Sequence, residues 1–203
     1  MKKSSSDNPL VNPRNLMPDL PQTAAPEQAL NLSTVRETSS IPKTGSESKW
    51  VYPSPQQFYH ALLRKNKSAD EESMDSVVFV HNQVNEDSWR QVMEYEALYQ
   101  HQCKEPSLQR FVGKSEEMSF KAKARKFFGF QATLFDRHDW FVDRCGIKSV
   151  RYIIDYYDTS NTDLTDRGGQ FDVMIDARPA PDSVQAVWDR IRKPMIDLAK
   201  SIF

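Results

Sequence analysis

All tryptophan, tyrosine and phenylalanine residues of this chain lie at or beyond Trp50. Residues 1–48 are rich in Pro, Ser, Asn and Thr and carry only scattered aliphatic side chains. Such a segment cannot bury enough apolar surface to offset the conformational entropy that it would lose on folding. We therefore predict a disordered N-terminal arm over residues 1–48 and a folded domain over residues 49–203.

The length of the chain and its charge limit what the folded domain can be. The 203 residues suffice for one domain of ordinary size plus appendages. The formal net charge of −1 argues against nucleic acid as a partner, because such proteins present a basic patch. No apolar run is long enough for a transmembrane helix, and MKKSSSDNPL has neither the apolar core of a secretory signal nor the arginines of a transit peptide.

Apolar residues at helical spacing predict five helices, within residues 54–66, 70–82, 85–101, 119–129 and 182–203. The first begins with a capping box of Ser54 and Gln57, with Pro55 at its first position. Pro194 should break or kink the last helix. In that helix we expect one apolar face to point inward, formed by Val184, Val187, Trp188 and Ile191.

Two segments alternate in the manner of strands, residues 149–158 and 170–178. The polar, turn-rich residues between them favour an antiparallel hairpin. We therefore expect an α+β fold: a mostly helical single domain with a small antiparallel β-hairpin or sheet.

The two cysteines, Cys103 and Cys145, do not form a recognised motif. Packed, reduced thiols are the expected state, and a single disulfide is the alternative. Activation of Cys145 as a nucleophile by His138, seven residues earlier, is a weak hypothesis because a turn is expected between them.

Familiar catalytic and metal-binding motifs are missing from the sequence. There is no glycine-rich phosphate loop, no HExxH and no GxSxG. No three or four His, Cys or Asp residues have the spacing of a zinc site, so a metal would take very few protein ligands. Haem meets this condition, because the porphyrin supplies four nitrogens and the protein one or two axial bonds.

Six ordered segments carry a family resemblance. They are KWVYPSPQQFYHALLRKN, VHNQVNEDSWRQVMEYEAL, PSLQRFVGK, LFDRHDWFVDRCG, VRYIIDYYD and ARPAPDSVQAVWDR. In this order they resemble the mitochondrial holocytochrome c synthases, also called cytochrome c haem lyases. The resemblance spans residue 50 to about residue 192. The Cys-Pro motifs common in the N-terminal arm of that family are absent, because no cysteine precedes Cys103.

The resemblance implies a carbon–sulfur lyase that attaches haem b to apocytochrome c. The two thiols of the substrate's CxxCH motif would add to the haem vinyl groups. His138, in FDRHDW, would be an axial ligand of the haem iron, opposite the histidine of CxxCH. From proximity in the sequence, we expect Asp136 or Asp139 to hold the second imidazole nitrogen. A histidine without a ligand is the alternative reading of His138.

The resemblance also points to further residues at the haem-binding site. Trp89 matches a tryptophan associated with the haem pocket, although it could equally pack in the core. His81 is either bonded locally or part of the pocket. Arg178 could pair with a haem propionate or with an acid of the hairpin, and we favour the second.

The family implies a peripheral protein of the mitochondrial inner membrane, on the side of the intermembrane space. The basic helix at residues 121–126, beside Phe127 and Phe128, gives this location some support. Two other functions remain open. One is a haem carrier or chaperone for cytochrome maturation that does not catalyse attachment, and the other is an interaction scaffold.

Overall fold

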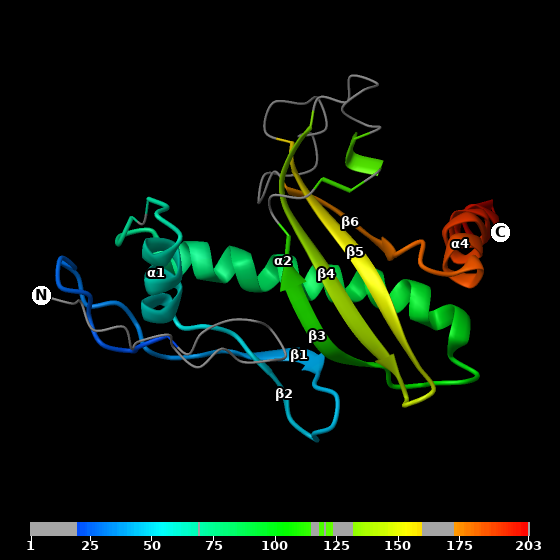
Figure 1. The fold of residues 1–203 in the computed structure, drawn as a ribbon, viewed down its shortest axis with the longest axis horizontal. Helices are drawn as coiled ribbons and strands as arrows, with labels where there is room; N and C mark the ends of the chain where they lie inside the picture. Colours follow the sequence, from blue (N-terminus) through cyan, green and yellow to red (C-terminus); the bar gives the residue numbers. More distant parts are fainter. Residues whose placement is uncertain are drawn as a thin grey trace, which may run out of the picture.

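The computed structural model describes residues 20–68, 70–114, 118–119, 121–123, 132–159 and 173–202. Its centre is a twisted antiparallel sheet with the strand order β3-β4-β5-β6. These strands are Ser107–Gly113, Thr133–Arg144, Lys148–Asp158 and Val173–Pro179. The long helix α2, Met74–Glu96, crosses one face of the sheet, with α1 beyond one end and α4 beyond the other (Figure 1).

The β4–β5 hairpin dominates the sheet. In its turn, Cys145 and Gly146 have positive φ angles of 51° and 74°. Turns with two positive φ angles have a backbone twist that matches the twist of the flanking strands. β5 pairs antiparallel with β6 as the alternation predicted. The expectation of a mostly helical domain is wrong, because β3 and β4 complete a four-stranded sheet. The sequence does not predict β4 as a strand, because charged side chains lie on both of its faces and no apolar alternation is visible.

The main core lies between α2 and the sheet. Trp89 and Val92 of α2 pack against Trp140 of β4 and against Tyr152 and Ile154 of β5, and all five are buried. The sequence predicted two helices in this region, yet α2 is continuous. Neither glycine nor proline separates the two predicted segments, so no residue ends the first helix.

The N-terminal helix α1, Pro55–Arg64, has the predicted capping box of Ser54 and Gln57. Before it, β1 (Thr38–Pro42) and β2 (Lys49–Val51) pair antiparallel. β1 lies within the range predicted to be disordered, so that prediction does not hold for this part of the arm. Residues 38–42 are ordered because they pack on the core of the folded domain. Ile41 of β1 belongs to that core and is only 3% exposed. Residues 1–19 of the predicted arm lie outside the described residues.

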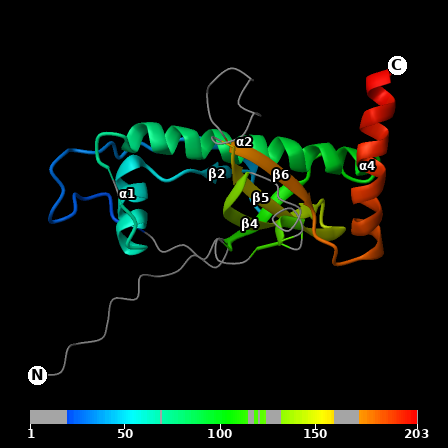
Figure 2. The ribbon, with the colours of Figure 1, turned by 90° about the horizontal axis from the view of Figure 1, so that it is seen from above.

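The C-terminal helix α4, Val184–Ile202, lies at one edge of the molecule and runs across the direction of α2 (Figure 2). It continues through Pro194 instead of ending there. The prediction of an inward apolar face is wrong, since Val184 is 88% and Trp188 52% exposed. The side chains that face the body are those of Ala186, Asp189 and Lys193.

A disulfide joins Cys103 to Cys145, so the expectation of reduced thiols is wrong and the alternative holds. It links the segment after α2 to the β4–β5 turn. Beside it, Arg144 of β4 donates two hydrogen bonds to Glu96 at the end of α2, at 2.7 and 2.8 Å. Of the helix predicted at residues 119–129, the structure describes helical residues 121–123. No helix in the described ranges is long and apolar enough to cross a bilayer.

Candidate functional site

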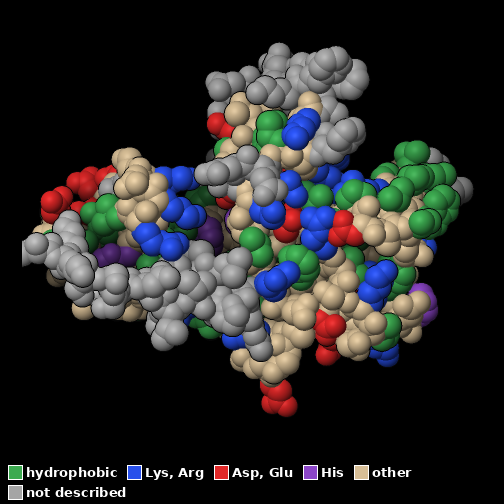
Figure 3. All heavy atoms as spheres, viewed as in Figure 1, with side chains coloured by type: hydrophobic (Ala, Val, Ile, Leu, Met, Phe, Trp, Pro, Cys, Tyr) green, Lys and Arg blue, Asp and Glu red, His purple; other side chains and the backbone are tan. Residues whose placement is uncertain are grey.

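His138 lies in β4 on the sheet face that α2 covers. Strand alternation puts it on the same face as Asp136 and Trp140. It is paired with Gly113 of β3 on one side and with Ile154 of β5 on the other. A strand therefore flanks His138 on each side, and α2 lies over this face of the sheet. Figure 3 shows histidine and basic side chains along the hollow between the α1 end of the molecule and the sheet.

The two ring nitrogens of His138 have different surroundings. Nε2 lies 3.4 Å from Oδ2 of Asp136. Nδ1 is buried and has no hydrogen-bond partner among the described residues. A proton on Nε2, facing the carboxylate, leaves the Nδ1 lone pair free. An unsatisfied buried acceptor is costly, and binding a metal ion there would remove that cost.

Burial sets the protonation state of this imidazole. It lowers the pKa of His138 because the imidazolium loses its hydration; the Asp136 charge opposes this effect and the Lys65 charge adds to it. His138 is therefore neutral at pH 7. A neutral imidazole is the form that can coordinate a metal.

Tyr156 and Gly113 complete the immediate surroundings of His138. The Tyr156 ring meets the imidazole edge to face, with centroids 5.4 Å apart, and its hydroxyl lies 3.1 Å from Ser88 Oγ of α2. A Cβ added at Gly113 would lie 3.6 Å from both Cδ2 and Nε2 of the imidazole. Neither residue can be recognised from the sequence alone, because only the strand register brings them to His138.

His81 of α2 belongs to the same region. Its pKa is lowered by burial, and His138 is among the charges that act on it. Its Nδ1 lies 3.1 Å from Asn82 Oδ1 and its Nε2 3.3 Å from Asn85 Nδ2, while Phe58 of α1 packs against the ring. His81 is thus bonded locally and also lies near His138, so the two readings from the sequence are compatible.

Trp89 packs in the main core and does not touch His138 in any contact of the described residues. Its ring centroid is 6.5 Å from that of Trp140, two residues after His138 in β4. Trp89 also lines, with Met93, a cavity of about 550 Å³ beneath the β1–β2 turn. Trp89 is therefore a core residue that lies against Trp140, on the same face of β4 as His138.

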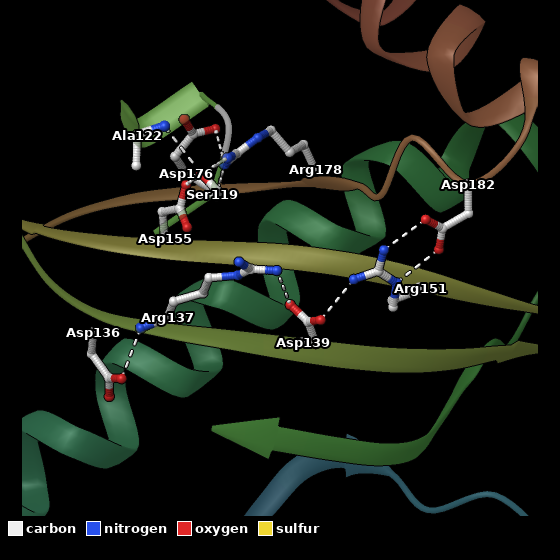
Figure 4. Close-up of polar contacts among 10 residues, drawn as sticks. All are labelled: Ser119, Ala122, Asp136, Arg137, Asp139, Arg151, Asp155, Asp176, Arg178 and Asp182. Atoms are coloured by element: carbon white, nitrogen blue, oxygen red, sulfur yellow. Dashed lines mark hydrogen bonds and ion pairs between the residues drawn. The ribbon is translucent and has the colours of Figure 1, made fainter. Parts of the chain in front are cut away.

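Arg178 lies on the opposite face of the sheet, away from His138. Its guanidinium donates to Ser119 Oγ at 2.9 Å, to the Asp176 carbonyl at 2.8 Å and to Asp155 Oδ2 (Figure 4). Burial opposes its charge, yet Asp176 and Asp155 raise the pKa of Arg178 above its ordinary value. The predicted pairing of Arg178 with an acid of the hairpin is therefore present, with Asp155 and Asp176 as the acids.

Asp139 also points to that opposite face, where it lies between two arginines. Its Oδ1 accepts from Arg137 at 3.0 Å and its Oδ2 from Arg151 at 2.7 Å (Figure 4). Of the two carboxylates expected to hold His138, only Asp136 lies next to the imidazole. The reason is the strand period, since adjacent residues of a strand point to opposite faces.

No three His, Cys, Asp or Glu residues in the described ranges are grouped so that they could hold a metal ion.

Comparison with known proteins adds an independent line of evidence. A family model described as cytochrome c/c1 heme lyase matches residues 1–194. The chain is 47% identical over 195 residues to a holocytochrome c-type synthase of Gallus gallus, covering 93% of this chain and 69% of that protein. It is 46% identical over 188 residues to one of Homo sapiens, covering 90% and 68%. Identity to a holocytochrome-c synthase of Saccharomyces cerevisiae is 35% over 210 residues, covering 92% and 77%. No solved structure matches the chain.

Proposed function

Because this chain belongs to the cytochrome c/c1 haem lyase family, we propose that it attaches haem b covalently to apocytochrome c. The bonds would be thioethers between the haem vinyl groups and the two cysteines of a CxxCH segment. The observation that carries the proposal is His138, a neutral imidazole whose Nδ1 is buried and unpaired among the described residues. Such a nitrogen suits a substrate that brings a metal already bound by four porphyrin nitrogens.

In this proposal His138 binds the haem iron and Asp136 orients the ring. The carboxylate at 3.4 Å keeps a proton on Nε2, so the lone pair stays on Nδ1. Tyr156, held by Ser88, limits rotation of the imidazole from one side. Gly113 leaves the Cδ2–Nε2 edge of the ring, remote from Nδ1, free of a side chain.

The reaction itself needs little acid–base chemistry from the enzyme. Each cysteine S–H adds across one vinyl double bond: the sulfur bonds to one carbon, the proton goes to the other, and nothing is oxidised or reduced. The role of the enzyme is to hold the two reactants in contact, which replaces a slow bimolecular encounter by a local reaction. Release of the product then requires that another ligand replaces His138 at the iron.

Arg178 and Asp139 take structural roles in this proposal. Both are buried in ion pairs on the sheet face opposite His138, so neither is expected to contact haem. Trp89 supports the site through Trp140. His81 is a pocket residue whose ring nitrogens are both engaged with asparagine side chains.

We also propose that the protein works in the mitochondrial intermembrane space, at the inner membrane. The Cys103–Cys145 disulfide supports an oxidising compartment, because cytosolic proteins rarely keep such bonds. The basic helix that the sequence suggested as a membrane contact lies mostly outside the described residues.

Co-expression with an apocytochrome c tests the function directly. Wild-type protein should yield cytochrome whose haem survives acid–acetone extraction, whereas a carrier without catalytic activity would leave it extractable. His138→Ala should lose both haem retention and attachment. The matched control is His101→Ala, an exposed histidine away from the site, which should behave as wild type. Normal attachment by His138→Ala would refute the ligand assignment.

A further inference from the structure

Helix α4 is attached to the protein by its polar side. Asp189 accepts from the Tyr99 hydroxyl at 2.8 Å, and Lys193 donates to Glu94 at 3.2 Å. Arg190 donates to the carbonyl of Pro179. Helices of soluble domains normally turn an apolar face to the core and a polar face to water. In α4 this arrangement is reversed.

The opposite side of α4 forms an exposed apolar stripe. Its members are spaced by three, four or seven residues and therefore share one face. The exposed fractions are 88% for Val184, 42% for Val187, 52% for Trp188, 51% for Ile191, 64% for Met195 and 63% for Leu198. Figure 3 shows hydrophobic side chains gathered at this edge of the molecule, over α4. A contiguous apolar patch of this kind marks an interaction site.

We propose that the stripe of α4 docks the protein on a lipid surface that carries anionic headgroups. An interfacial helix has aliphatic residues and tryptophan on one face and basic residues beside them. α4 contains Arg190, Arg192, Lys193 and Lys200 against two acids. Lys193 faces the body and pairs with Glu94 and Asp197, and Arg192 pairs with Asp189. Arg190 and the exposed Lys200 therefore supply the remaining positive charge of the helix.

A second copy of the chain fits the stripe less well. A stable dimer takes about 20–30 residues from each partner, and the stripe has six. A lipid surface needs no complementary shape, and a helix at the edge of the molecule can lie flat on it (Figures 1 and 2). This inference deepens the membrane location proposed above and does not depend on the haem chemistry, which co-expression tests separately.

Binding to vesicles provides the first test. The full chain should co-sediment with vesicles of phosphatidylcholine and phosphatidylglycerol, and less with phosphatidylcholine alone. Ile191→Asp combined with Leu198→Asp should weaken binding by roughly 100-fold, because two charges would enter the apolar layer. Phe79→Asp combined with Ile147→Asp is the matched control, because it adds two charges at exposed apolar positions outside α4, and it should keep wild-type binding. An unchanged urea unfolding curve would show that the double variant is folded.

The tryptophans provide the second test. Trp50, Trp89 and Trp140 are at most 9% exposed, whereas Trp188 is 52% exposed. Brominated lipids should therefore quench the fluorescence of Trp188, and Trp188→Phe should remove the quenching while the protein still binds. The proposal is overturned if wild type does not bind the anionic vesicles, or if the double variant binds them as tightly. It is also overturned if light scattering shows a dimer that the double variant dissociates.

Discussion

Gly113 and His138 face one another across the β3–β4 pair, and a methyl group at residue 113 would lie 3.6 Å from the imidazole. That distance is ordinary van der Waals contact, so one carbon fits beside the ring. A larger side chain would press on the Cδ2–Nε2 edge of the ring, away from the nitrogen assigned to the iron, and would displace the imidazole. The size of residue 113 therefore controls the position of the imidazole and, with it, the direction of Nδ1.

We expect Gly113→Ala to retain haem and Gly113→Leu to lose it. The leucine should weaken haem retention by roughly tenfold or more, because overpacking beside the ring costs free energy. The measurement is the Soret absorbance of purified protein, compared at equal protein concentration. Equal haem content in both variants would mean that the position of the imidazole does not decide haem binding.

The two aspartates that flank His138 in the sequence should respond differently to replacement. Asp136→Asn removes the carboxylate that faces Nε2 and should lower haem affinity by about 10–100-fold. Asp139→Asn instead deprives two arginines of a partner and should lower the free energy of unfolding by about 1–3 kcal/mol. Haem titration and urea unfolding separate the two effects. A larger loss of affinity in Asp139→Asn would contradict the assignment.

Local patterns were sufficient to predict some elements. The capping box of Ser54 and Gln57 starts α1 because neighbouring residues satisfy it. The pairing of β5 with β6 could be predicted because apolar and polar residues alternate within each of these two segments. The candidate ligand His138 came from the resemblance of FDRHDW, since one histidine between charged residues has no chemical signature of its own.

Other features depend on residues far apart in the chain. The spacing in α4 predicts which side chains share a face, but not which face turns inward. Tyr99 and Glu94, nearly a hundred residues earlier, bind the polar face and decide the orientation. The order of β1 also depends on distant residues, because Ile41 packs in a core formed by residues later in the chain. The positions of Gly113 and Tyr156 beside His138 follow from strand register, which composition does not reveal.

The disulfide should contribute substantially to stability. Cys103 and Cys145 are 42 residues apart, and closing a loop of this length stabilises a fold by about 4 kcal/mol in the chain-entropy model. Replacing both cysteines by serine should lower the urea midpoint of unfolding by a corresponding amount. Reductant should lower the midpoint of the wild type and leave that of the variant unchanged. A wild type that does not respond to reductant would show that the bond makes no net contribution.

Acid should weaken the attachment of the β1 segment. Glu86 of α2 accepts hydrogen bonds from Ser39 Oγ at 2.6 Å, the Ser40 amide at 3.0 Å and the Tyr52 hydroxyl at 2.8 Å. Burial opposes its ionisation, but these donors lower the pKa of Glu86 below its ordinary value of 4.5. The unfolded chain then binds the proton more tightly than the folded one. The stabilisation is complete above pH 4.5 and is lost as the pH falls through the folded-state pKa.

Glu86→Gln should therefore lower the free energy of unfolding by about 1–3 kcal/mol at neutral pH, because one neutral oxygen replaces a carboxylate that accepts several hydrogen bonds. The difference between the variant and wild type should shrink as the pH falls below 4.5. Urea unfolding at a series of pH values measures both effects. Glu72→Gln, at an exposed position just before α2, is the matched control and should follow the wild-type curve. A Glu86→Gln difference that stays constant down to low pH would mean that the carboxylate charge does not hold β1 in place.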